Sequence, residues 1–117
     1  MNLTSRLKQS NALAELLRIL ECNRAGGHTG IYSVCASHSL VLQATMCQAL
    51  QDDAILLIEA TANQVNQFGG YTGMKPGDFP PYVYGLADKV GLSRDRIILG
   101  GDHLGPLCWT DEPTEQA

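Results

Sequence analysis

Apolar side chains recur every three or four residues in three parts of the chain, which is the spacing of one face of an amphipathic α-helix. The three stripes are Leu13, Leu16, Leu17 and Leu20; Leu40, Ala44 and Cys47; and Phe79, Val83, Leu86 and Val90. Glycine or polar residues follow each stripe, so we expect the helices to end near Gly26–Gly27, Asp52–Asp53 and Gly91. Because prolines lack a backbone N–H, the third helix should begin at Pro80 or Pro81.

Three shorter apolar runs alternate with these helices and predict β-strands. They are Gly30–Ala36, Ala54–Ile58 and Arg96–Gly100. The run Ala54–Ile58 is continuously apolar, which is typical of a strand buried on both faces of a parallel sheet. The order helix, then strand–helix–strand–helix–strand, predicts parallel strands joined by right-handed crossovers.

The end of the sequence predicts a helix that is not completed. Thr110 to Glu115 has the polar cap, early acidic residues and proline of a helix N-terminus, and the sequence stops at Ala117. A sheet of three parallel strands leaves edges and one face uncovered. A (β/α)8 barrel needs about 200 residues or more, and a five-stranded doubly wound fold would also lack strands. We therefore expect a fragment of a larger α/β fold.

The composition argues against several classes of binding partner. Among 117 residues, 8 are Lys or Arg and 12 are Asp or Glu, for a net charge of −4. No basic cluster is present, which argues against binding to nucleic acid or to an anionic membrane surface. No apolar run reaches the roughly 20 residues of a membrane-spanning helix, and Met1–Ser10 lacks the apolar core of a signal peptide. We expect a cytoplasmic protein.

Four cysteines, Cys22, Cys35, Cys47 and Cys108, form no C-x-x-C pair. The sequence therefore shows neither a zinc knuckle nor a thioredoxin-type redox motif. We expect four reduced thiols in a cytoplasmic protein.

Candidate chemistry lies in the loops after the strands, because ligands of parallel α/β folds bind at the carboxyl ends of the strands. After the first strand, His38 could bind phosphate or transfer a proton, or it could be an ordinary residue at a helix N-terminus. After the second strand, the carboxylate of Glu59 follows an apolar run and needs a cation, hydrogen-bond donors or a proton.

The segment Thr61–Gly77 is polar, glycine-rich and long for a connection, and such loops are usually functional. It carries neutral amides suited either to sugar hydroxyls or to fixing the loop itself, namely Asn63, Gln64, Asn66 and Gln67. The spacing Gly70-x-x-Gly73-x-Lys75 fits neither a Walker A loop nor the dinucleotide fingerprint.

The most specific feature follows the third strand, where the sequence reads Gly100-Gly101-Asp102-His103. Adjacent Asp and His at a strand end project differently, so Asp102 could handle a proton while His103 binds a metal. The pair could equally be structural, and a catalytic zinc needs three protein ligands. We expect Cys108 and Trp109 to be packing residues.

Two stretches, Ile58–Met74 and Ile97–Pro106, together resemble the non-catalytic subunit family of tagatose-bisphosphate aldolase, whose members were also labelled tagatose 6-phosphate kinases. The resemblance extends from about Gly30 to Trp109. It departs from the family at Cys35-Ala36-Ser37-His38-Ser39-Leu40, which lacks the usual proline, and at Pro80–Pro81.

The resemblance implies a class II aldolase-like (β/α)8 barrel several times longer than this chain. Residues 1–29 would be the N-terminal helix and turn, 30–109 the first three strand–helix units, and 110–117 the start of a further helix. The family supports a separate, zinc-dependent catalytic class II aldolase subunit. That complex splits D-tagatose 1,6-bisphosphate into glycerone phosphate and glyceraldehyde 3-phosphate in galactitol and N-acetylgalactosamine breakdown.

The resemblance also suggests roles for individual residues. Asp102 occupies the position of the aldolase proton donor, and His103 that of a zinc ligand. The candidates for binding a sugar phosphate are Ser33, His38, Glu59, Asn63 and Gln64. Two other readings stay open: an enzyme in its own right, either a zinc lyase or the kinase of the older label, and a non-functional truncated gene product.

Overall fold

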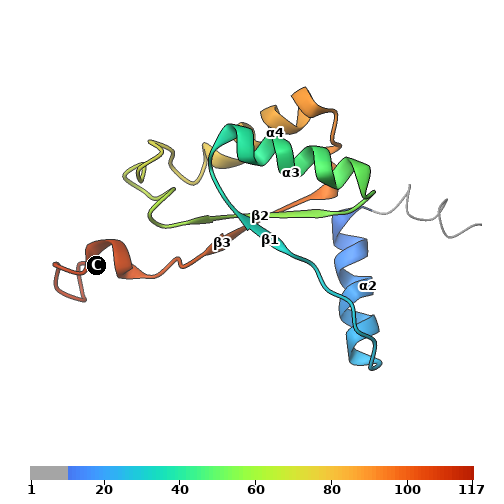
Figure 1. Ribbon diagram of the computed structural model, residues 1–117. Coiled ribbons are helices and arrows are strands. Elements are labelled where there is room, and N and C mark those ends of the chain that lie inside the picture. Colours follow the sequence, from blue (N-terminus) through green and yellow to red (C-terminus); the bar gives the residue numbers. More distant parts are fainter. Residues whose placement is uncertain (1–10) are drawn as a thin grey trace, which may run out of the picture.

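The computed structural model describes residues 11–117, so the expectation for Met1–Ser10 lies outside the described part of the chain. Three parallel strands, β1 (Ser33–Cys35), β2 (Leu56–Thr61) and β3 (Ile97–Asp102), form one sheet in the order β1-β2-β3 (Figure 1). Each strand is followed along the chain by a helix or a helical turn. The predicted alternation of strands and helices in an α/β fold is therefore confirmed.

Helices α3 (Ser39–Gln51) and α4 (Phe79–Val90) lie together on one side of this sheet (Figure 1). Val83 of α4 belongs to the same hydrophobic core as Leu56 and Ile58 of β2, and all three side chains are fully buried. Leu57 points to the opposite, open face and is only half-buried. The expectation that this run is buried on both faces therefore holds only at the amino-terminal end of the second face, where Ile55 is buried against α2, and fails at Leu57.

The predicted helix Leu40 to Asp52–Asp53 forms, but through a different face. Its buried side chains are Leu42, Met46 and Ala49. The predicted stripe of Leu40, Ala44 and Cys47 is exposed. Apolar residues occur on more than one face of this helix, so its sequence contains two stripes of helical spacing. Packing against the sheet buries the stripe of Leu42, Met46 and Ala49.

Helix α2 (Ala12–Arg24) lies at the amino-terminal edge of the sheet (Figure 1). The side chain of Asn11 caps it by accepting a hydrogen bond from the Ala14 N–H at 2.9 Å. Ala12 and Ile19 are its buried residues, and they pack with Ile55. The predicted leucine stripe instead faces outward, with Leu13, Leu17 and Leu20 exposed.

Other boundaries differ by a few residues from those expected. Strand β1 is shorter than Gly30–Ala36, and α4 begins at Phe79, one residue before the first proline. Gly91 ends α4 as predicted, with φ of 86°. A 3-10 turn, η2 (Pro106–Trp109), follows β3, and turns follow it over residues 110–117. Over residues 11–117, no helix is long and apolar enough to cross a membrane.

Candidate functional site

The carboxyl-terminal half of the open sheet face is polar. Cys35 and Glu59 are register partners, and Glu59 is in turn the partner of Gly100. Because Gly100 has no side chain, the Glu59 carboxylate has space on this face, and a Cβ at Gly100 would lie 3.4 Å from Glu59 Cγ. Asp102, paired with Thr61, stands one row further toward the carboxyl edge.

These carboxylates influence the neighbouring thiol. Burial, followed by the negative charges of Asp102 and Glu59, raises the pKa of Cys35 above its ordinary value. Cys35 is therefore held as a neutral thiol at pH 7, which is the opposite of what a nucleophilic cysteine requires.

Ser33 lies one row before Cys35 and Glu59 on the open face. Its register partner there is Leu57. The structure therefore does not bring Ser33 to the carboxyl edge together with Asp102.

Asp102 and His103 form a local pair, with 3.4 Å between Asp102 Oδ1 and His103 Nε2. His103 adopts a positive φ of 51°, and its side chain is 68% exposed. Within residues 11–117, no three side chains of His, Cys, Asp or Glu converge on a metal-sized site. The described residues thus offer one imidazole beside one carboxylate, which is not the three-ligand set of a catalytic zinc.

The loop after β2 is held by its own hydrogen bonds. Asn66 Oδ1 accepts from the N–H groups of Phe68 and Gly70, at 2.8 and 3.1 Å, while its Nδ2 donates to the Ala62 carbonyl. The Thr72 hydroxyl accepts from the Met74 N–H at 3.1 Å. For Asn66, the expectation that an amide fixes the loop is confirmed.

Gln64 joins this loop to the sheet. Its side chain is buried, and its Oε1 accepts from the Thr61 N–H at 2.8 Å and from Cys35 Sγ at 3.9 Å. Its backbone carbonyl accepts from the Thr72 hydroxyl at 2.6 Å. Gln64 therefore links the ends of two strands with the far side of the loop.

Asn63 contacts the end of the chain. Its Oδ1 accepts from Cys108 Sγ at 3.0 Å, and nearby the rings of Phe68 and Trp109 meet edge to face with centroids 6.1 Å apart. The expectation that Cys108 and Trp109 are packing residues is confirmed, since both hold η2 against the loop.

His38 is the N-cap residue of α3, and its Nδ1 accepts from the Leu40 N–H at 3.3 Å. The preceding residue is anchored by Tyr82 of α4, whose hydroxyl donates to the Ser37 carbonyl at 2.8 Å. His38 thus has the structural role of a residue at a helix N-terminus, which was one of the alternatives expected for it. It also lines an open cavity.

This cavity, of about 550 Å³, lies between residues 35–38 and the loop after β2, where Gln64, Tyr71 and Thr72 line it. Sequence reasoning singled out His38 and Gln64 but missed Tyr71 and Thr72. Their position in the long polar loop was the available signal. Only the folded loop shows that they face the segment after β1.

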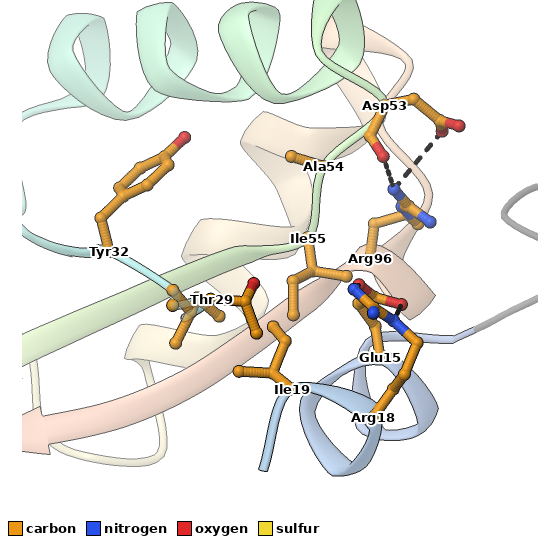
Figure 2. Close-up of a pocket in the computed structure, with 11 residues that line it drawn as sticks. Glu15, Arg18, Ile19, Thr29, Tyr32, Asp53, Ala54, Ile55 and Arg96 are labelled. Carbon is orange, nitrogen blue, oxygen red and sulfur yellow. Dashed lines mark hydrogen bonds and ion pairs between the residues drawn. The ribbon is translucent and has the colours of Figure 1, made fainter. Parts of the chain in front are cut away.

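A second cavity, of about 140 Å³, lies at the opposite, amino-terminal edge of the sheet (Figure 2). Two ion pairs border it. Arg18 bonds Glu15 within α2, and Arg96 bonds the backbone carbonyl and side chain of Asp53. The first pair is internal to α2, whereas the second ties the segment before β3 to the segment before β2.

Comparisons with known proteins agree with this architecture. The family model described as D-tagatose-1,6-bisphosphate aldolase subunit GatZ/KbaZ-like matches residues 16–117. The chain is 58% identical over 99 residues to the D-tagatose-1,6-bisphosphate aldolase subunits GatZ of Salmonella paratyphi B and Salmonella typhimurium. Each alignment covers 85% of this chain and 23% of the relative.

A solved structure is also similar. A probable tagatose 6 phosphate kinase from Sinorhizobium meliloti 1021 superposes with a TM-score of 0.71 at 51% sequence identity, covering 75% of this chain and 23% of that one. The chain thus spans about a quarter of the length of the relatives it matches. The resemblance found in the two motif-bearing stretches is confirmed, and the chain belongs to the GatZ/KbaZ-like family of D-tagatose-1,6-bisphosphate aldolase subunits.

Proposed function

We propose that this protein is a non-catalytic subunit that supports the stability and activity of a class II tagatose-bisphosphate aldolase. The observation that carries the proposal is the 58% identity to GatZ subunits over 99 residues, together with the family match over residues 16–117. The complex would serve the cytoplasmic breakdown of galactitol and N-acetylgalactosamine. In it, the zinc-dependent cleavage belongs to the partner, the catalytic subunit.

The same proposal includes the architecture of a (β/α)8 barrel, of which this chain forms the first three units. Helices α3 and α4 cover one sheet face. The other face is covered only at its amino-terminal end, by α2, and carries half-buried Leu57 and Ile98 one row before Glu59. A parallel sheet normally has both faces covered, and in a barrel the strands enclose the second face themselves. The open face of this sheet would then be the inside of the barrel.

The residues at the carboxyl edge support a sugar phosphate as the ligand class. Glu59 and Asp102 share the open face there, and His38 and Gln64 line the adjacent cavity. Carboxylates accept from sugar hydroxyls, while amide and imidazole N–H groups donate to hydroxyl or phosphate oxygens. By the resemblance, Asp102 would take the position of an aldolase proton donor, and we propose that it orients a sugar hydroxyl there.

The accessory role can be tested by the heat stability of the catalytic subunit. The catalytic class II aldolase from the same source is purified with and without the intact protein, and its half-life at a fixed elevated temperature is measured. We expect the two proteins to co-purify and the half-life to lengthen several-fold. An equal concentration of an unrelated protein controls for non-specific protection. Unchanged half-life without co-purification would contradict the proposal.

A further inference from the structure

We propose that the open cavity between Ser37–His38 and the loop after β2 is a subsite for the phosphate-bearing end of a sugar phosphate, with Tyr71 packing against the carbon chain of the sugar. The inference rests on the proposed function for the class of sugar. It adds the location of the phosphate and assigns a role to Tyr71, an exposed aromatic residue that the accessory function leaves unexplained.

The first observation concerns the protonation of His38. Its Nδ1 accepts the capping hydrogen bond from the Leu40 N–H, so the neutral ring carries its proton on Nε2. His38 lines the cavity, and its Nε2–H is a donor that the cap leaves unused. A phosphate oxygen is an acceptor with which such a donor forms a strong, charge-assisted bond.

The second observation concerns the amide of Gln64, a residue only 7% exposed. Its Oε1 is occupied by the Thr61 N–H and by Cys35 Sγ. Among the described residues, its Nε2 has no hydrogen-bond partner, and no buried side-chain nitrogen or oxygen is left unsatisfied there. The Nε2 group therefore contacts solvent, and Gln64 meets solvent at the cavity it lines.

The side of the cavity formed by His38 favours an anion. The described side chains that line the cavity include no carboxylate, and the first turn of α3 carries no acidic residue. The positive end of the helix dipole lies at His38, the N-cap residue. Cys35, on the other side of the cavity, is subject to the negative charges of Asp102 and Glu59, so the phosphate would lie beside His38 and not beside Cys35.

Tyr71 supplies an apolar surface beside these donors. It is 72% exposed, and its backbone is fixed because its N–H donates to the Asn63 carbonyl at 2.9 Å. Thr72 next to it bonds the Gln64 carbonyl. A tyrosine side chain has only two χ angles to order, so its ring offers contact area at little cost in conformational entropy.

The test is isothermal titration calorimetry of the intact protein with D-tagatose 6-phosphate, D-tagatose and inorganic phosphate. We expect D-tagatose 6-phosphate to bind at least about tenfold more tightly than D-tagatose, because the phosphate contacts are charge-assisted. Inorganic phosphate should compete with the ester. Equal affinity for D-tagatose and its phosphate ester would overturn the assignment.

Two variants locate the phosphate. His38→Asn retains a side chain that caps helices well but removes Nε2, and Gln64→Glu retains Oε1 while replacing the donor with a carboxylate oxygen. Each should weaken D-tagatose 6-phosphate binding about tenfold or more. Circular dichroism melting of each variant separates lost binding from lost fold. Wild-type affinity in folded H38N would place the phosphate elsewhere.

A matched pair tests the aromatic contact. Tyr71→Ala and Phe68→Ala remove equally exposed rings from the same loop, 72% and 77% exposed, but only Tyr71 lines the cavity. Y71A should weaken binding several-fold and F68A should not, and equal effects would refute the role of Tyr71.

Heat protection of the catalytic subunit is measured separately on the wild-type protein. Protection without this binding pattern would overturn the subsite alone, whereas the pattern without protection would overturn the accessory role.

Discussion

At the scale of single residues, Gly70 shows how a missing side chain fixes the shape of the long loop. Its φ is 55°, and a Cβ there would lie 2.8 Å from the Asn63 carbonyl oxygen and closer still to that of Gln64. The backbone of the loop folds back onto the residues that line the cavity. Only glycine permits this close approach without displacing Gln64.

Substituting Gly70 with Ala should therefore disturb the loop more than the same change at Gly73. Gly73 also has a positive φ, 77°, but nothing lies within 4 Å of a Cβ there. We expect G73A to cost about 1–2 kcal/mol of unfolding free energy from backbone strain alone, and G70A to cost a few kcal/mol because the clash is added. Urea unfolding measures both. Equal costs would mean that the backbone contact is not the constraint.

Glu15 is the residue that couples charge to stability at the amino edge (Figure 2). Its side chain is 14% exposed, and the hydrogen bond from Arg18, with the positive charges of Arg18 and Arg96, lowers its pKa below the ordinary 4.5. A carboxyl group whose pKa is lowered by folding stabilises the folded state above its unfolded value. That contribution disappears as the pH falls from about 4.5 through the lowered value.

The variant Glu15→Gln should reveal this contribution. Wild type should be more stable than E15Q at neutral pH, and the difference should shrink as the pH falls below 4.5. Urea unfolding across this pH range measures it. Glu21→Gln provides the control, because Glu21 is exposed on the same helix and forms no ion pair within the described residues. A difference between wild type and E15Q that does not depend on pH would contradict the assignment.

The tendency of ligands to bind at the carboxyl ends of parallel strands explains which candidate residues could be found from the sequence. Glu59 and Asp102 were identified because polar residues after an apolar run mark the carboxyl edge, and register pairing places both on the open face. Ser33 was proposed only from the resemblance, and the structure places it in the first row of β1, as the register partner of Leu57. The long polar loop was a signal for Tyr71, but the sequence does not show that this residue faces the segment after β1, because the hydrogen bonds of the folded loop bring it there.

At the scale of elements, α3 shows that apolar spacing predicts a helix but not always which of its faces is buried. The strand–helix order, the approximate position of each helix and the role of Gly91 followed from glycine, proline and apolar spacing. The buried face of α3 did not, because two stripes of equal spacing coexist in it and only the position of β2 decides between them. The same holds for α2, whose buried Ile19 lies outside the leucine stripe.

A pair of substitutions on α3 tests this assignment. Leu42 is fully buried and Leu40 is 69% exposed. L42A should lower the unfolding free energy by about 2–5 kcal/mol, since it opens a cavity in the core. L40A should change it by no more than about 0.5 kcal/mol. Urea unfolding of the intact protein measures both, and a larger loss in L40A would mean that α3 packs through the originally predicted stripe.

At the scale of the whole molecule, the described residues form an open three-stranded sheet with α3 and α4 on one side (Figure 1). Helix α2 and the segment after β3 project from opposite ends of the sheet (Figure 1). An open sheet face and this shape fit a segment whose surfaces are completed by other parts of a barrel.

The central claim is that this protein supports tagatose-bisphosphate cleavage without performing it. The most direct measurement is the rate of D-tagatose 1,6-bisphosphate cleavage by the intact protein alone, by the catalytic class II aldolase subunit alone, and by the two together. We predict no cleavage by the intact protein alone and a higher, longer-lasting rate for the pair than for the catalytic subunit. Cleavage by the intact protein alone, or an unchanged rate in the mixture, would contradict the account.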